Sequence, residues 1–326
     1  MENISFEPTK IILKKCMELR PEESCLIITD KTRLNLSKKV LASARQITES
    51  SEIMLMPELE NNGSEPTVKV AHKMLKFDVI LILTSKSMSH TKARLNATNV
   101  GARIASMPGI TKEILNRAID VDYKEMSLRT NLIADMLDNS KNVRITTALG
   151  TKISFSIKGR KAHGRKSGIY NKPSYWGNLP EGEAFIAPVE GSANGKYIVD
   201  ASQAGIGKLK EPITIHVKNG YAYDFSGDRA IKLQEFLKKF KDKNAFNIAE
   251  FGIGTNNKAI ITGNVLEDEK VFGTCHIALG NNFGFGGQVN IPVHVDGIID
   301  KPTIILDGKV MMKYGILKKD LKTIKL

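Results

Sequence analysis

The sequence predicts an α/β protein: an N-terminal parallel-sheet α/β domain, residues 1–140, followed by a β-rich mixed α+β domain, residues 141–326. Before residue 140, short apolar runs alternate with helical patterns, as in a parallel sheet covered on both faces. After it, runs alternate apolar and polar residues with period two between turns. With 326 residues, 41% of them hydrophobic, the chain is long enough for two cores.

In the N-terminal domain, strands and helices are expected in strict alternation. The strands are predicted at 24–29, 52–56 and 79–83, and the helices at 34–47, 67–75, 112–118 and 126–137. None of these strands is followed by G-x-G-x-x-G or by a P-loop, so dinucleotide and P-loop nucleotide functions lose their main support.

A polar segment follows the third predicted strand. Ser87 or Ser89 is expected to cap a helix that ends near Asn99, because a serine side chain can accept a bond from the first free amides. This part of the chain also contains His90, Arg94 and Arg103. These side chains could contact a neighbouring site, but helix capping and salt bridging are the favoured interpretation.

In the C-terminal domain, N-V-R-I-T-T-A-L-G-T-K-I-S-F-S-I at 142–157 alternates around an L-G-T turn, which predicts a β-hairpin. The same pattern predicts further strands at 196–200, 213–217 and 221–225.

Composition restricts the partners and the compartment. The net charge of +13 is spread along the chain, and its one dense basic cluster, 158–166, lacks the interleaved aromatic residues that stack on bases, so we expect no nucleic-acid partner. The N-terminus shows no signal-peptide pattern and the longest apolar runs are too short to span a bilayer, so we expect a cytoplasmic protein without a membrane partner. Its three cysteines lack C-x-x-C spacing, which argues against disulfides and a thiolate zinc site.

The most informative motif is I-P-V-H-V-D-G near the C-terminus. His294 and Asp296 are two residues apart in an alternating run, so both side chains leave the same face of a strand. An imidazole and a carboxylate on one rigid strand are suited to binding a metal ion together.

Three other segments place potential ligands in apolar surroundings. They contain Glu250 in A-E-F-G-I-G-T-N, His276 in G-T-C-H-I-A-L-G-N-N, and Glu181 and Glu183 in L-P-E-G-E-A-F-I-A-P. A single apolar-strand histidine is more often a core residue than a ligand, and a solvated surface position is the simpler reading of Glu181. Taken together, the four segments favour a metal site in the second domain.

These segments resemble the M29 family of metallopeptidases, of the aminopeptidase T type. The similarity extends to S-H-T-K-A-R and G-A-R-I-A-S-M-P-G in the first domain and to L-E-D-E-K at 266–270. The resemblance implies a homodimeric, broad-specificity exopeptidase with two divalent ions. It places the metal ligands at Glu183, Glu250, His276, His294 and Asp296.

The chain departs from this family in two places. Phe283 occupies the position of an active-site tyrosine, and the spacing between His276 and His294 is shorter than in better-known members. The family's fold is also shared by an iron-dependent, ring-cleaving dioxygenase of hydroxylated pyridines, so the fold alone does not fix the chemistry.

Three carboxylates and two imidazoles suit zinc, cobalt or manganese. Two dications, three carboxylates and a bridging hydroxide would make a neutral cluster, with Glu250 as the bridging carboxylate. The leading hypothesis is a metallo-aminopeptidase that hydrolyses peptide substrates with a metal-activated water. Candidates for binding the substrate amine or moving the proton are Glu181, Tyr175 and Tyr170.

Two alternatives remain. His276, His294 and Asp296 form a two-histidine, one-carboxylate set like that of mononuclear non-haem iron(II) oxygenases. Alternatively, the chain is a binding protein that kept the scaffold but lost the reaction, as Phe283 in place of tyrosine suggests.

Overall fold

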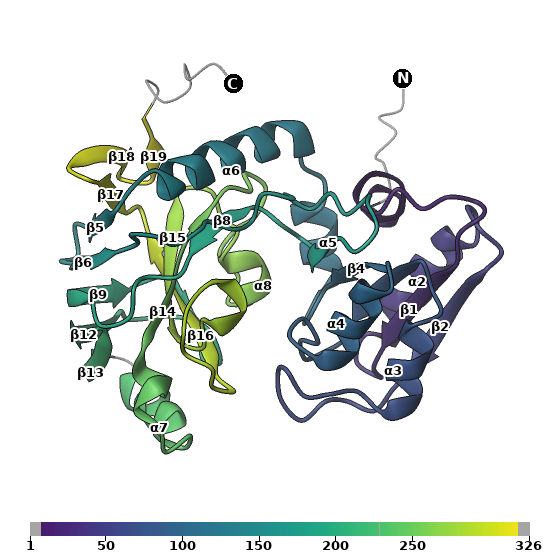
Figure 1. The fold of residues 1–326 in the computed structure, drawn as a ribbon, viewed down its shortest axis with the longest axis horizontal. Coiled ribbons are helices and arrows are strands. Elements are labelled where there is room, and N and C mark those ends of the chain that lie inside the picture. The colour runs from purple at the N-terminus through teal and green to yellow at the C-terminus, as the bar shows by residue number, and fades with distance from the viewer. Residues whose placement is uncertain (1–7, 228, 319–326) are drawn as a thin grey trace. The chain divides into compact units, whose positions relative to one another are not determined.

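The computed structural model describes residues 8–227 and 229–318, which form two compact units (Figure 1). Unit 1 combines the chain up to Tyr123 with Lys166–Glu181, and unit 2 combines Lys124–Arg165 with the chain from Gly182 onward. The sequence predicts one boundary near residue 140, whereas the chain passes between the units at 123/124, 165/166 and 181/182.

Unit 1 is built on a five-stranded parallel sheet in the order β2-β1-β3-β4-β7. The strands are β1 (Cys25–Thr29), β2 (Ser51–Leu55), β3 (Val79–Leu83), β4 (Arg103–Ser106) and β7 (Trp176–Asn178). Every residue of β1 and β3 is buried, as expected for parallel strands covered on both faces. The predicted parallel α/β architecture is confirmed.

Helices pack around this sheet (Figure 1). They are α1 (Pro8–Lys10), η1 (Ile11–Cys16), α2 (Leu34–Ala44), α3 (Val68–Met74), α4 (Lys92–Asn99) and α5 (Lys112–Ala118). The predicted cap of α4 was wrong: Thr91 accepts the bond from the amide of Arg94 at 3.2 Å, whereas Ser89 turns its hydroxyl to Ser106. A threonine directly before the first helical residue satisfies the end of the helix without a longer loop.

Unit 2 contains two antiparallel sheets. The larger has the order β13-β12-β9-β6-β5-β17-β18-β19. Its strands are β5 (Asn142–Thr146), β6 (Lys152–Ser156), β9 (Asn194–Val199), β12 (Ile213–Lys218), β13 (Tyr221–Gly227), β17 (Thr303–Leu306), β18 (Lys309–Lys313) and β19 (Ile316–Leu317). The predicted hairpin is confirmed as β5 and β6.

The second sheet has six strands in the order β11-β10-β16-β15-β14-β8. The strands are β8 (Glu183–Ile186), β10 (Ser202–Gln203), β11 (Gly207–Lys208), β14 (Ile248–Gly254), β15 (Thr274–Gly280) and β16 (His294–Asp300). Helical segments complete the unit: α6 (Tyr123–Asp138), α7 (Ala230–Lys238), η2 (Lys243–Phe246), α8 (Val265–Asp268) and η3 (Phe283–Phe285).

One apolar core joins the two sheets of unit 2. Phe155 from β6 meets Phe251 from β14 edge to face, with ring centroids 5.4 Å apart, and Ile133 and Leu137 of α6 belong to the same core. The second sheet therefore turns one face to this core and keeps the other for polar side chains. In the described parts of the chain, 8–227 and 229–318, we find no helix with the length and apolarity needed to cross a bilayer.

We expect the fully buried β3 to tolerate little change. Ile80 has no exposed surface, so Ile80→Ala should lower the free energy of unfolding by about 2–5 kcal/mol through lost burial and a residual cavity. Leu95→Ala, at a position 47% exposed on α4, should change it by no more than about 0.5 kcal/mol. Urea unfolding of both variants measures the difference, and equal losses would contradict this description of the core.

Candidate metal centre

Four neighbouring strands of the six-stranded sheet present five potential ligands on one face. Glu183 begins β8, Glu250 lies on β14, His276 on β15, and His294 and Asp296 on β16. Residues alternate between the faces of a strand, so the other side chains of β14 and β15, such as Phe251 and Ile277, point into the core. Alternation thus separates the metal-competent face from the apolar face.

Small residues leave room between these side chains. Gly252 pairs with His276 across β14 and β15, and Ala278 stands between Glu250 and Asp296 in register. A Cβ built on Gly252 would overlap Nε2 of His276. The strand therefore needs glycine here to make room for the Nε2 end of the imidazole.

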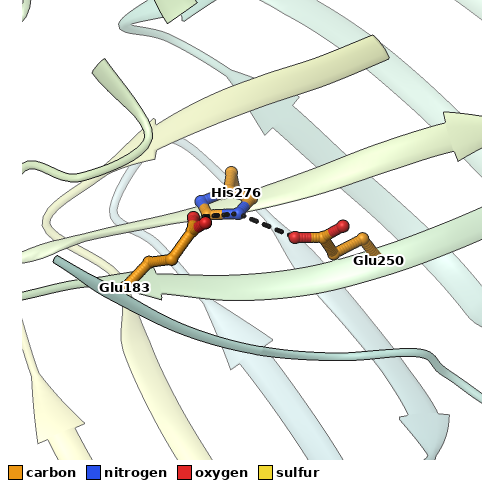
Figure 2. Close-up of side chains that lie close together, drawn as sticks. All are labelled: Glu183, Glu250 and His276. Carbon is orange, nitrogen blue, oxygen red and sulfur yellow. Dashed lines mark hydrogen bonds and ion pairs between the residues drawn. The ribbon is translucent and has the colours of Figure 1, made fainter. Parts of the chain in front are cut away.

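The first group joins three strands. Nε2 of His276 lies 3.4 Å from Oε2 of Glu183 and 3.4 Å from Oε1 of Glu250. Figure 2 shows both carboxylates pointing at the imidazole ring. All three residues are buried, with Glu183 7%, Glu250 6% and His276 0% exposed.

The second group shares Glu250 with the first. Nε2 of His294 lies 3.3 Å from Oε2 of Glu250 and 3.3 Å from Oδ1 of Asp296. Nδ1 of His294 lies 2.8 Å from the backbone carbonyl of Asn281, to which it donates. This bond fixes the ring and leaves Nε2 for the carboxylates, as is usual for a histidine that binds metal.

The electrostatics of the cluster follow from its burial. Burial alone would lower the pKa of His276, but the hydrogen bond and charge of Glu250 and the charge of Glu183 outweigh it and raise the pKa to about 9. His294 is likewise raised well above its usual pKa, by Asp296 and Glu250. Burial would raise the pKa of Glu250, yet the two imidazoles hold it well below the usual range. Without metal, protons on the histidines balance the carboxylates.

The residues present fit a divalent cation. Within each group the potential ligand atoms lie within 4.8 Å of one another. Oε2 of Glu183 is buried and has no hydrogen-bond partner in the structure. Leaving a buried carboxylate oxygen unpaired is costly, and a cation between Glu183 and His276 would satisfy it.

One charged member of the cluster was missed by the sequence analysis. Lys270 is completely buried, and its Nζ lies 2.5 Å from Oε1 of Glu183 and 2.6 Å from Oε1 of Glu269. Burial raises the pKa of Glu269 to about 8. The signal was present in L-E-D-E-K, where a lysine ends an acidic run that the fold buries.

The other predicted active-site residues lie in unit 1 or on the surface of unit 2. Glu181 is buried and accepts a hydrogen bond from the hydroxyl of Tyr170 at 3.1 Å, and Tyr175 lies under the ammonium of Lys166. Catalytic roles for Glu181 and Tyr175 therefore stay predictions. Phe283, in η3, is 62% exposed.

Known proteins resemble this chain over most of its length. A family model described as "NicX: 2,5-dihydroxypyridine 5,6-dioxygenase" matches residues 10–319. The chain belongs to this family. The 2,5-dihydroxypyridine 5,6-dioxygenase of Pseudomonas putida KT2440 is 23% identical over 249 residues, which are 72% of this chain and 70% of that protein. The description of the NicX family names an enzyme, and the candidate metal groups agree with a metal-binding one.

Two solved structures share the fold. The 2,5-dihydroxypyridine dioxygenase of Pseudomonas putida KT2440 superposes with a TM-score of 0.80 at 17% identity, covering 97% of this chain and 98% of that chain. AmpT from Thermus thermophilus superposes with a TM-score of 0.72 at 15% identity, covering 95% and 98%. The resemblance to M29 enzymes is confirmed for the fold, while the family shown is NicX.

The close approach at Gly252 generates a test. Gly252→Ala should displace the imidazole of His276, weaken zinc binding at least tenfold, and cost about 1–3 kcal/mol of stability through overpacking. Zinc titration calorimetry and urea unfolding measure both effects. In a His276→Ala background, where the ring is absent, the same substitution should cost much less stability. An equal cost in both backgrounds would contradict the proposed overlap.

The raised pKa of His276 predicts how the metal-free protein responds to pH. The pKa of His276 is about 9 in the folded protein and about 6.5 in the unfolded chain. The protonated imidazole therefore stabilises the folded state fully below about pH 6.5, and this stabilisation is lost as the pH rises through about 9. The free energy of unfolding, measured in urea with a chelator present, should therefore fall between about pH 6.5 and 9. This decrease in the free energy of unfolding should be smaller in the His276→Gln variant. It should be unchanged in the control variant His216→Gln, which alters a histidine on β12. A flat profile for the unaltered protein would contradict the assignment.

Proposed function

We propose that this protein is a metallo-aminopeptidase that holds two divalent ions and hydrolyses the N-terminal peptide bond of peptide substrates. The observation that carries the proposal is the division of the ligands into two groups that share Glu250. A carboxylate with one oxygen toward each group is suited to bridging two ions.

The composition of the two groups favours hydrolysis over oxygen chemistry. Each group has one histidine and two carboxylates, and the two histidines fall in different groups. Mononuclear iron(II) oxygenases use two histidines and one carboxylate around one ion. The set His276, His294 and Asp296 is not gathered into one group among the described residues.

The charge balance also supports two ions. Two dications and a bridging hydroxide bring about +3, which Glu183, Glu250 and Asp296 offset. The ammonium of Lys270 adds one charge, and the carboxylate of Glu269, 2.6 Å away, offsets it when ionised. Dications nearby would favour this ionised form of Glu269, because opposite charges stabilise each other.

The protein's own residues have distinct tasks in this proposal. Glu183 and His276 would hold one ion, His294 and Asp296 the other, and Glu250 both. Such ions supply a water of lowered pKa and polarise the scissile carbonyl. Lys270 holds the carboxylate of Glu183 in place, and the carbonyl of Asn281 orients His294. Phe283 has no proton to give, so proton transfer falls to another group, for which Glu181 and Tyr175 are our candidates.

A second candidate function is favoured by the family. The NicX family model and the Pseudomonas putida relative both carry the name of a 2,5-dihydroxypyridine 5,6-dioxygenase. On this alternative, one iron(II) ion would serve an oxygen-dependent opening of a hydroxylated pyridine ring. One fold can host both reactions, so the metal centre has to decide between them.

Metal content and turnover separate the two functions. We expect about two zinc, cobalt or manganese ions per chain and release of N-terminal residues from dipeptides and aminoacyl anilides. One iron per chain, with oxygen uptake in the presence of 2,5-dihydroxypyridine, would overturn the proposal in favour of the dioxygenase. Full two-ion occupancy without turnover of any peptide would leave a binding protein.

The bridging role of Glu250 is tested by Glu250→Gln. The amide cannot bridge two cations as a carboxylate does, so occupancy should fall from about two ions to one or none while the far-ultraviolet circular dichroism spectrum stays unchanged. Glu58→Gln, which removes one charge from an exposed position, should keep both ions. Retention of two ions by Glu250→Gln would show that another group bridges them.

A further inference from the structure

Unit 1 contains a buried arginine without a carboxylate partner. Arg94 on α4 is 7% exposed, and its guanidinium lies over the ring of Trp176, 3.7 Å from the centroid. Its Nε donates to the carbonyl of Ser89 at 2.7 Å and its Nη1 to the hydroxyl of Thr98 at 3.3 Å. Both partners are neutral, so within the described residues the charge of Arg94 has no ion pair.

Arg103, another buried arginine of unit 1, has a carboxylate partner. It is 5% exposed, and both of its terminal nitrogens lie 2.8 Å from the carboxylate oxygens of Glu23. Burying a charge without an opposite charge is costly, and burial lowers the pKa of Arg94 to about 10. For Arg94 this cost is offset only by two hydrogen bonds to neutral oxygens and by the face of the Trp176 ring, not by an opposite charge.

The surroundings of Arg94 add positive charge. Partial burial and the charge of Arg94 lower the pKa of Lys166, and the charge of Glu181 opposes this shift only in part. The ammonium of Lys166 lies 4.5 Å from the ring centroid of Tyr175. Arg94 and Lys166 are therefore two like charges that repel each other, and Glu181 acts on Lys166. A bound anion would relieve this repulsion, whereas without one it destabilises the fold.

The position in the sheet also suits a ligand. The hydroxyl of Ser89 lies 2.9 Å from Ser106 Oγ and 3.1 Å from Asn178 Oδ1, and these two residues end β4 and β7. Arg94 is therefore anchored at the carboxyl ends of parallel strands, the edge where open α/β sheets bind ligands. Trp176 and Asn178 are half-buried, which leaves this edge accessible.

We propose that Arg94, with Lys166 beside it, forms a carboxylate-binding site in unit 1 whose ligand is a small organic acid or the carboxyl end of a short peptide. A guanidinium has five N–H groups, and Nε and one N–H of Nη1 are already used. The remaining N–H groups on Nη1 and Nη2 form the fork that binds a planar carboxylate through two parallel bonds.

The chain carries its own reporter for this site, because Trp176 is its single tryptophan. N-acetylglycine titrated into the metal-free, full-length protein should change the tryptophan fluorescence saturably, with a Kd of about 1 mM. Its uncharged amide should cause no saturable change. Acetate, tested in parallel, represents a free acid, and the tighter of the two carboxylates identifies the source of the ligand.

Variants separate binding from a structural role. Arg94→Gln should weaken binding at least tenfold, Arg94→Lys should weaken it less because the charge remains, and Lys166→Gln should weaken it a few-fold. Arg45→Gln, which removes an exposed charge from the same unit, should bind like the unaltered protein. If Arg94→Gln does not fold, Lys166→Gln decides, because its side chain is exposed and its loss should be tolerated.

Three results would overturn the site: no saturable change in the unaltered protein, equal binding of the amide, or unchanged affinity in a folded Arg94→Gln variant or, if that variant does not fold, in Lys166→Gln. Because the titration uses metal-free protein, its outcome is independent of the function proposed for the metal centre.

Discussion

The carboxylate of Glu250 is the constraint on which the arrangement of unit 2 depends. It is almost entirely buried, and its two oxygens face two different imidazoles, on β15 and β16. A buried carboxylate has to be compensated, and compensation from both sides requires three adjacent strands in one fixed register. A slip of one residue would turn the ligands into the apolar core. The small residues Gly252 and Ala278 follow from the same requirement, since larger side chains would fill the space between the charged groups.

Much of the ligand arrangement within each strand could be predicted from the sequence, because the alternation of faces along a strand depends only on neighbouring residues. Alternation along β16 places His294 and Asp296 on one face of the strand, and alternation along β15 places His276 on the face opposite Cys275 and Ile277. Contacts between distant segments could not be predicted in this way. Lys270 is 87 residues from Glu183 in sequence, and only the folded chain shows that its ammonium is buried against that carboxylate. Likewise, β7 has three residues, W-G-N, with no apolar run, and joins a sheet whose other strands end 70 residues earlier in the chain. The three crossings between the units follow from the same non-local pairing.

Fold and chemistry carry different information here. The NicX family match covers nearly the whole chain, and AmpT shares the fold at lower similarity, so the backbone is compatible with proteins of both kinds. At such low identity the scaffold is shared more widely than the reaction. What distinguishes the possibilities is the number and type of ligands on one face of one sheet. A second carboxylate in each group, rather than a second histidine, is the feature of this chain that favours a pair of ions.

The bond from His294 to the carbonyl of Asn281 has an evolutionary consequence. Asn281 directly follows β15, and His294 pairs in register with Gly280, the last residue of that strand. Further bonds fix both ends of the connection between the two strands, because the amide of Asn281 donates to the carbonyl of Val293 at 2.8 Å and the amide of Asn282 to that of Val289 at 3.0 Å. The residues at 283–288 lie between these bonds, and Phe283 is 62% exposed. Insertions and deletions at this tip are therefore expected to leave the second histidine in place, whereas changes at the buried Val289, Ile291 or Val293 would disturb the core.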